Sequence, residues 1–345
     1  MEIGVENSRT GTINKNMDKR MSHVTHTDIL KFAEKSVNMR ESDVRDHRRQ
    51  VTVLREKLQA KIKDNPDYKL KKICLSGSLA KGTALRDIND IDVALYVKCE
   101  QPEDMKKFIE WLVDEMRELY PNMEPSQIKS QEFSINISYR GSGLDVDVVP
   151  ILYQGDAVDD GTDKDDEWDG LLCSQDSGKW LKTNIPRHIA FIQARKERNP
   201  THFRQIVRLV KYWVAQRKTE NNNFKFKSLM VELIVAHMAD KRIMKMNDYI
   251  EAMVQFFKFI EQGGLDNIIA FNDYYDFVET AHAAPIRVFD PANSKNNVAS
   301  ACRQSDRDMI IHKCGAAADA IAGADCAPNK EKANEYWRKV FGPSF

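Results

Sequence analysis

The sequence predicts an α+β protein of two lobes, with a small mixed sheet and a long N-terminal helix in the first lobe and a helical C-terminal lobe. Three observations carry this prediction. Apolar residues recur at helical spacing over residues 27–63, short runs rich in β-branched residues follow as far as residue 153, and the pattern from Pro186 onward is almost wholly helical. The length of 345 residues also suits two domains better than one core.

We divide the chain into three predicted segments, residues 1–25, 26–185 and 186–345. The first segment is polar and without a period, so it is expected to be disordered, and either Met1 or Met21 could be the native start. The second is the predicted α/β lobe and the third the predicted helical lobe. Because ligand sites favour interfaces between domains, we expect the active cleft between the two lobes.

The first predicted element is a single amphipathic helix from Thr27 to Lys63. Its apolar stripe predicts one buried face, and Asn65-Pro66 ends the helix because proline disfavours a helical conformation in the residue before it. The stripe is formed by Val37, Val44, Val51 and Leu58.

Four short strands follow in the predicted sheet lobe. A helix over 105–119 separates the second strand from the third, and a Gly-Ser-Gly turn separates the third from the fourth. An acidic loop over 155–170 marks the end of this lobe. The predicted strands are 71–78, which runs into a turn, 90–98, 131–140 and 143–153.

Composition excludes several classes of protein. Lys plus Arg and Asp plus Glu both number 52, so no overall positive field draws the chain to long nucleic acids. No stretch approaches the roughly 20 apolar residues of a membrane-spanning helix, and the start of the chain lacks the apolar core of a signal peptide. The six cysteines show no paired CxxC spacing, which favours reduced thiols and a cytoplasmic location, with no membrane partner.

Two Asp-x-Asp motifs lie on predicted strands. Side chains alternate along a strand, so Asp90 and Asp92 point to one side, and Asp145 and Asp147 repeat the arrangement on an apolar strand. Carboxylates held side by side resist ionisation unless a cation neutralises them. Oxygen ligands suit Mg²⁺, whose remaining ligands are waters and substrate phosphates. The motifs therefore predict metal-dependent phosphoryl or nucleotidyl transfer.

A Gly-Ser turn precedes these strands. Gly77 and Ser78 lie where a strand gives way to a predicted helix, so backbone N–H groups and the Ser78 hydroxyl can meet a phosphate. Lys81 and Thr83 lie within the next turn and could bind the same anion. Singly, Asp-x-Asp on an edge strand and Gly-Ser in a turn are commonplace. Their combination within this spacing makes the functional interpretation the better one.

The string GSLAKGTALRDINDIDVALYV resembles the signature of the polymerase-β-like nucleotidyltransferases. It is most similar to 2′-5′-oligoadenylate synthetases and to the CD-NTases, the cGAS/DncV-like nucleotidyltransferases of bacterial CBASS antiphage signalling. The likeness extends to DVDVVP, IVRLVKYWVAQRK, KSLMVELIVAH and RVFDPANSKNNV, and so covers most of residues 70–300.

The resemblance implies a bilobal fold and a role for individual residues. Gly77 and Ser78 would grip a triphosphate, and Asp90, Asp92 and Asp147 would bind Mg²⁺ or Mn²⁺. Asp145 is the second choice for the third carboxylate, because Asp147 directly precedes the Val-Val-Pro that matches the family motif. The reaction implied is attack of a ribose hydroxyl on an α-phosphate with release of pyrophosphate, which joins ATP, and other nucleoside triphosphates, into a cyclic oligonucleotide second messenger.

The resemblance also extends to the predicted helical lobe. The lysine that matches Lys211 reaches the triphosphate in the family, and Ser228 matches a position near the nucleotide. Read from spacing alone, the other cations of the stripe on helix 201–218 belong to a solvated surface: Arg204, Arg208 and Lys218. Leu229 stands where relatives carry an aromatic that stacks on the base, so base identity stays open. Other aromatics that could stack are Phe224, Phe226, Tyr153 and Trp180, each of which is more often a packing residue.

Two alternatives to a cyclase stay open. The first is a transferase that adds nucleotides to RNA or to a small molecule such as an antibiotic, although the balanced charge argues against a bulky RNA. The second is a catalytically silent nucleotide sensor, against which the complete set of carboxylates argues. The resemblance further implies regulation by a HORMA-domain protein, by a nucleic acid, or by nucleotide supply alone.

Two further patterns resemble metal sites, but neither predicts one. Residues Asp165 to Asp176 fit a calcium loop loosely, but position 12 is Asp where Glu is usual, and an acidic loop beside the cleft explains them better. His312 and Cys314, with Cys302 and Cys326 to either side, lack the close cysteine pairs of structural zinc sites, so we expect buried thiols there.

Overall fold

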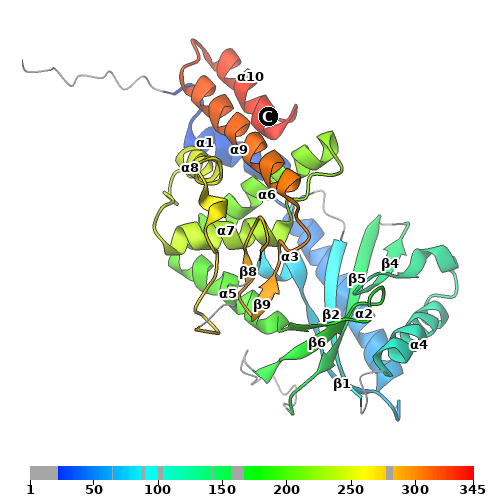
Figure 1. Ribbon diagram of the computed structural model, residues 1–345. Coiled ribbons are helices and arrows are strands. Elements are labelled where there is room, and N and C mark those ends of the chain that lie inside the picture. The colour runs from blue at the N-terminus through cyan, green and yellow to red at the C-terminus, as the bar shows by residue number, and fades with distance from the viewer. Residues whose placement is uncertain are drawn as a thin grey trace, which may run out of the picture.

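The computed structural model describes residues 22–63, 65–86, 90–99, 104–141, 143–156, 167–276 and 283–345. A sheet with two long helices forms one half of the molecule, and a bundle of helices forms the other (Figure 1). The predicted fold class, a bilobal α+β chain with a small sheet and a helical C-terminal lobe, is therefore confirmed.

The helix predicted over 27–63 is interrupted. α1 (His26–Phe32) and the π-helical turn η1 (Ala33–Val37) precede a break, after which α2 (Glu41–Ile62) begins. Asn38 at the break is extended, and its side chain exchanges hydrogen bonds of 2.8 and 3.1 Å with Gln205. Arg86 donates to backbone carbonyls of η1 and of Asn38, which satisfies groups that a continuous helix would have paired internally.

The segment before α2 packs into the helical half of the molecule. Val24, Ile29 and Phe32 belong to the core of the helical half, and Phe32 stacks on Phe341 of the C-terminal helix at 5.0 Å. Thr25 caps α1 through a hydrogen bond from the backbone of Asp28. Disorder was predicted as far as residue 25, and residues 22–25 contradict it, whereas residues 1–21 lie outside the described part of the chain.

The sheet has the strand order β1-β2-β5-β4-β3. β2 and β5 pair in parallel at its centre, and the other pairs on this path are antiparallel. β6 and β7 extend the sheet from the end of β5, and the sequence pattern predicted neither strand. The strands are β1 (Lys69–Leu75), β2 (Asp90–Lys98), β3 (Ile128–Ser130), β4 (Ile135–Tyr139), β5 (Leu144–Tyr153), β6 (Gly170–Cys173) and β7 (Trp180–Thr183).

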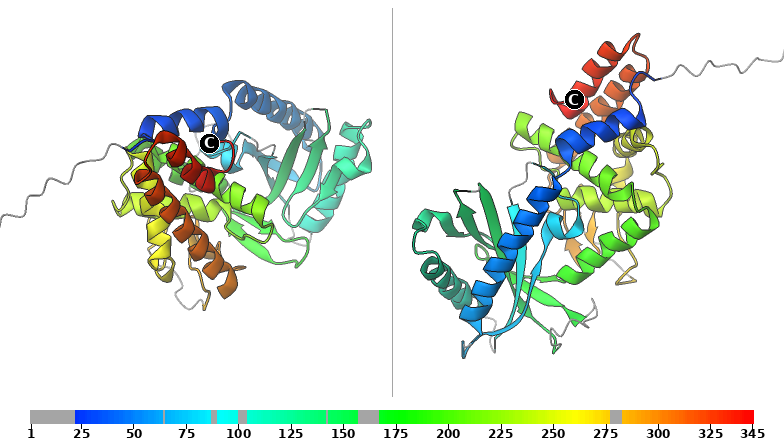
Figure 2. Two further views of the ribbon diagram at one scale, coloured as in Figure 1. Left: turned by 90° about the horizontal axis from the view of Figure 1, so that it is seen from above. Right: turned by 180° about the vertical axis from the view of Figure 1, so that it is seen from behind.

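The two faces of the sheet are covered differently. α2 and α4 (Asp104–Leu119) cover one face and bury its apolar side chains, and α2 is seen running across the back of the sheet in Figure 2. On the opposite face, Tyr96, Tyr153 and Trp168 form a small aromatic core over the later part of β2 and β5. The start of both strands on that face carries aspartates instead, which leaves a polar edge toward the helical half.

The helical half is built around α6 (Phe203–Glu220), which is buried along most of its length. The transition predicted at Pro186 agrees with α5, which begins at Ile185. A short hairpin of β8 (Phe289–Asp290) and β9 (Asn293–Asn297) lies beside β7. The remaining helices are α5 (Ile185–Arg198), α7 (Ser228–Asp240), α8 (Tyr249–Glu261), α9 (Gln304–Asp325) and α10 (Lys330–Phe341), with 3-10 turns at Pro125–Gln127 and Gly264–Asp266.

The rejected metal patterns do not form sites among the described residues. Asp165 lies outside the described part of the chain, and residues 170–173 of the same stretch are strand β6 where a loop was expected. Cys302 and Cys314 are buried thiols, as predicted, whereas Cys326 is exposed. His312 is exposed as well and forms no metal-binding group with them.

Candidate active site

Four aspartates form a two-by-two array on the central parallel strands. In the register of β2 with β5, Asp90 lies opposite Asp145 and Asp92 lies opposite Asp147. Since alternate residues of a strand share a face, all four side chains project to the same side of the sheet. The intervening Ile91 is buried on the other face, in the core with α2 and α4.

Three of these carboxylates, those of Asp90, Asp92 and Asp147, resist ionisation. Burial, and after it the charge of Asp147, raises the pKa of Asp92 to about 6. Burial and the neighbouring aspartates also raise the pKa of Asp90 and of Asp147. A cation placed among them would offset both the cost of burying the charges and the repulsion between the carboxylates, because it stabilises the ionised form. The donor set of carboxylate oxygens fits Mg²⁺.

The aspartates do not by themselves complete a metal site. No group of three His, Cys, Asp or Glu side chains within the described ranges converges tightly enough to enclose an ion. Magnesium commonly takes one or two carboxylates and completes its shell with water and substrate phosphates. The array therefore offers some of the oxygen ligands that Mg²⁺ takes, and leaves the rest of a shell to water or phosphate oxygens.

Asn136 on β4 is a member of the site that the sequence analysis missed. It lies opposite Asp147 in the antiparallel register of β4 with β5, and its amide donates a hydrogen bond of 2.9 Å to Oδ1 of Asp147. This bond lowers the pKa of Asp147 against the larger effect of burial. The available signal was Asn136 itself, a polar residue between two isoleucines of the strand sequence INISY, whose partner depends on strand register.

The Gly-Ser turn lies directly against Asp92. The backbone N–H of Ser76 donates to the carbonyl of Asp92 at 2.8 Å, and α3 (Gly77–Lys81) follows at once. Gly77 has a φ of +59°, and a Cβ there would lie 1.6 Å from Oδ2 of Asp92. Only glycine permits this approach, which brings partly exposed Ser78 next to the carboxylates.

Glu232 is a buried carboxylate that was not predicted, and it binds Lys81, Thr83 and Lys211. Glu232 of α7 accepts from Lys81 at 2.5 Å, from Thr83 Oγ1 at 2.7 Å and from Lys211 at 3.3 Å. Lys211 also donates to the backbone carbonyl of Thr83 at 3.0 Å. Lys211 and Thr83 are buried behind the turn, so their predicted contacts with a phosphate stay predictions. A lone acid within the apolar run LMVELIVA was the available signal.

The cations before Lys211 on α6 are not a simple solvated surface. Arg208 donates to the carbonyl of Gly82 at 3.4 Å and to Gln205 at 3.1 Å, and the guanidinium of Arg204 packs against Gly82. Burial lowers the pKa of both arginines. The surface prediction was wrong for these two and is confirmed for Lys218, which is exposed.

Ser228 is the first residue of α7 and is exposed. It lies one turn before Glu232, and residues four apart share a side of a helix, so Ser228 faces the same side as the buried lysine pair. Leu229 packs partly into the helical core.

Most of the candidate stacking aromatics are packing residues. Phe224 and Phe226 are buried against Trp213, and Tyr153 is buried against Trp168. Trp180 on β7 is 36% exposed and is the most exposed member of this set.

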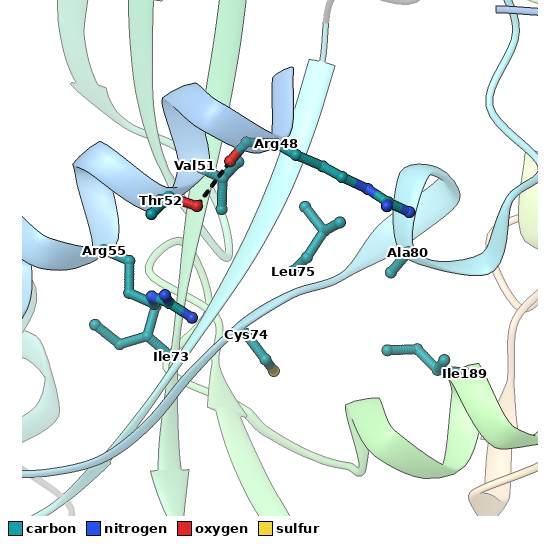
Figure 3. Close-up of a pocket in the computed structure, with 9 residues that line it drawn as sticks. All are labelled: Arg48, Val51, Thr52, Arg55, Ile73, Cys74, Leu75, Ala80 and Ile189. Atoms are coloured by element: carbon teal, nitrogen blue, oxygen red, sulfur yellow. Dashed lines mark hydrogen bonds between the residues drawn. The ribbon is translucent and has the colours of Figure 1, made fainter. Parts of the chain in front are cut away.

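A separate cavity of about 380 Å³ lies between α2, β1, α3 and α5 (Figure 3). Its walls include Ile73, Leu75 and Ile189, and Arg48 extends across it toward Ala80. It contains none of the predicted site residues. α3, which follows the Gly-Ser turn, borders this cavity, but the aspartate array does not line it.

Comparison with known proteins gives a family. The sequence pattern of the Second Messenger Oligonucleotide or Dinucleotide Synthetase domain matches residues 21–199. A cyclic AMP-AMP-AMP synthase of Escherichia coli strain MS 115-1 is 43% identical over 325 residues, which are 94% of this chain and 98% of that protein. A CBASS oligonucleotide cyclase, CdnC, of E. coli strain KTE188 is 28% identical over 93% of this chain and 98% of its own length.

Solved structures agree with this assignment. The structure of E. coli MS115-1 CdnC with ATP superposes with a TM-score of 0.82 at 44% identity and covers 94% of this chain and 99% of that one. Vibrio cholerae DncV in complex with a linear intermediate shares the fold at 13% identity, with a TM-score of 0.67 over 94% of this chain and 97% of its own.

The described helices include none that is long and apolar enough to cross a membrane. The cytoplasmic location stays a prediction. The match to the family pattern spans more than half of the sequence. The chain therefore belongs to the Second Messenger Oligonucleotide or Dinucleotide Synthetase family and is a nucleotidyltransferase that makes cyclic oligonucleotides.

Proposed function

We propose that this chain condenses ATP into a cyclic oligoadenylate, with Asp90, Asp92 and Asp147 as the metal-binding carboxylates. The observation that carries the proposal is the register of β2 with β5, which puts Asp92 opposite Asp147 beside the Gly77 turn. A triphosphate bound at the turn would lie against carboxylates that need a cation. The relative of 43% identity is a cyclic AMP-AMP-AMP synthase, which supports adenine as the base.

Each residue would have a separate task. Gly77 and Ser78 would bind the triphosphate through backbone N–H groups and the hydroxyl, and the positive charge of Lys81 would favour it. Asp147, held by Asn136, would accept the proton of the attacking ribose hydroxyl. The new P–O bond forms as the bond to the bridging oxygen of the α-phosphate breaks, and pyrophosphate leaves.

Mg²⁺ is the cofactor that the carboxylate oxygens fit best. Asp90, Asp92 and Asp147 would hold it, and when bound it would supply positive charge for the triphosphate and lower the pKa of the attacking hydroxyl. Mn²⁺ accepts the same oxygen ligands.

A HORMA-domain protein is the proposed regulatory partner. The solved structure of E. coli MS115-1 CdnC in complex with a HORMA protein covers 94% of this chain at 43% identity, with a TM-score of 0.81. We expect a HORMA protein to co-purify with this chain and to change its rate. Full activity of the chain alone, with no protein co-purifying, would reject this partner.

The test of the function is product analysis. Purified chain is incubated with labelled ATP, GTP, CTP and UTP in Mg²⁺ or Mn²⁺, with and without a HORMA protein or duplex DNA, and then treated with phosphatase. We expect a phosphatase-resistant product containing only adenine by mass spectrometry, and none from the Asp90→Asn/Asp92→Asn variant. A product with linear ends, or nucleotide added to an RNA or small-molecule acceptor, would contradict the proposal.

A further inference from the structure

Glu232 is a buried carboxylate in an otherwise apolar part of α7. It is 1% exposed, and both of its oxygens are used: Oε2 accepts from Lys81, and Oε1 accepts from Thr83 and Lys211. A carboxylate is costly to bury unless charged donors compensate it. The neighbours of Glu232 in α7 are apolar, so a hydrophobic residue would fill the position without that cost. Packing alone therefore does not account for a glutamate at this position.

The partners of Glu232 come from both halves of the molecule. Lys81 ends α3 and Thr83 follows it, whereas Lys211 comes from the middle of α6. Lys211 is itself 3% exposed and donates to the Thr83 carbonyl at 3.0 Å. One carboxylate thus fixes the end of the phosphate-binding turn against two helices of the helical lobe.

The charges of this cluster do not cancel. Two lysines share one carboxylate, so Glu232 alone does not neutralise them, and the charge that remains beside the turn also interacts with Asp92. The side chain of Lys81 is 12% exposed, and those of Lys211 and Glu232 are almost fully covered. Glu232 therefore fixes the position of this positive charge without itself facing the site.

We propose that Glu232 is a positioning residue for nucleotide binding, which holds the Lys81 ammonium group and the Thr83 segment at the turn where the triphosphate is proposed to bind, with Lys211 buried behind them. The inference rests on the proposed function, because it assumes that the turn binds the triphosphate. Glu232 acts through Lys81, the more exposed of the two lysines, and has no contact with the reacting atoms. Without its charge, the lysines would repel one another and leave their positions.

A purely structural role would predict a different result. Asp240 supplies the matched control, because it ends the same helix and pairs with buried Arg195 at 2.6 Å, away from the turn. Breaking either ion pair lowers stability, so a loss of stability alone does not separate the two roles. Nucleotide affinity does separate them.

The experiment compares full-length wild type with Glu232→Gln, Glu232→Asp, Lys81→Met, Glu232→Gln/Lys81→Met and Asp240→Asn. Binding of α,β-methylene ATP in Mg²⁺, KM and kcat for ATP, and thermal unfolding are measured. We expect Glu232→Gln to raise Kd and KM at least about tenfold and to change kcat less than about threefold, the range of a lost charge-assisted contact. Glu232→Asp, which keeps the charge but shortens the side chain, is expected to fold and to show a smaller loss of affinity.

The double variant tests whether Glu232 acts through Lys81. If it does, Glu232→Gln should weaken binding further by less than about twofold in the Lys81→Met background. Asp240→Asn should lower Tm and leave Kd unchanged. The inference is overturned if the Glu232 variants lose stability but bind with wild-type affinity, or if the two losses multiply. Absence of product from wild type that still binds nucleotide, with a HORMA protein or duplex DNA added, would instead refute the proposed function and leave this inference intact.

Discussion

The amide of Asn136 donates a hydrogen bond of 2.9 Å to Oδ1 of Asp147, and the two residues are register partners on neighbouring antiparallel strands. The bond fixes the orientation of the carboxylate that is proposed to receive the proton. Residues that orient metal-binding or catalytic carboxylates commonly matter about 10–100-fold. Asn136→Ala should therefore lower kcat by about tenfold in assays of cyclic product. Ser138→Ala is the control, because Ser138 lies opposite Asp145 on the same strand. If Ser138→Ala lowers kcat as much as Asn136→Ala does, the effect comes from any change on β4 and not from the bond to Asp147.

The register of β2 with β5 also ranks the two candidates for the third carboxylate. Asp147 lies opposite Asp92, which is packed against the turn, and Asp145 lies opposite Asp90, which is more exposed than Asp92. We expect Asp147→Asn to reduce product formation by about 100-fold or more, and Asp145→Asn by less than about tenfold. Initial rates with ATP and Mg²⁺ measure both. The reverse order would make Asp145 the ligand.

Gly77 should not tolerate a side chain. A Cβ would collide with Oδ2 of Asp92, and the φ of +59° disfavours any other residue. Gly77→Ala is therefore expected to abolish nucleotide binding, measured by titration with α,β-methylene ATP. Gly178→Ala is the matched control: its φ is +66°, but nothing lies within 4 Å of the added Cβ. It should cost about 1 kcal/mol of stability and leave binding unchanged. Equal losses of binding in both variants would point to backbone strain in general.

Asp92→Asn should stabilise the metal-free chain at pH 8. The folded-state pKa of Asp92 is raised to about 6 by burial and by Asp147, above its usual value of 3.8. The protonated form is therefore favoured in the fold, and stability is lost as pH rises from about 4 through about 6. Removing the charge should recover up to about 3 kcal/mol of unfolding free energy, because one pKa unit is worth about 1.4 kcal/mol. Urea unfolding in EDTA at pH 5 and pH 8 measures this, and equal stabilities of wild type and variant at pH 8 would contradict it.

The negative charge of Glu232 should stabilise the fold, whereas that of Asp92 should destabilise it. Burial alone would raise its pKa, but Lys81 and Lys211 outweigh burial and hold that pKa at about 2, below the usual 4.5. The carboxylate therefore contributes stability above pH about 4.5, which is lost as pH falls toward about 2. We expect wild type to lose more unfolding free energy than Glu232→Gln between pH 6 and pH 3, measured by urea unfolding. If the unfolding free energy of the two proteins falls equally over this pH range, the ionised Glu232 contributes no such stability.

Local patterns in the sequence determined the fold class and the carboxylates. Alternation along a strand decides which side chains share a face, so Asp90 and Asp92 could be paired from spacing alone. The change from β-branched runs to helical spacing near Pro186 matched the start of α5 at Ile185. The motif combination supplied the family resemblance, which the match over residues 21–199 and the relative of 43% identity confirm.

The tertiary structure decided which residues meet. The break at Asn38 depends on Gln205 and Arg86, the orientation of Asp147 depends on Asn136, and the charge of Glu232 depends on Lys81 and Lys211. Periodicity encodes the direction of a side chain within its own helix or strand, but not the partner it finds on another. Strand register and helix packing fix those partners over separations such as the 151 residues between Lys81 and Glu232, so only the folded chain determines them.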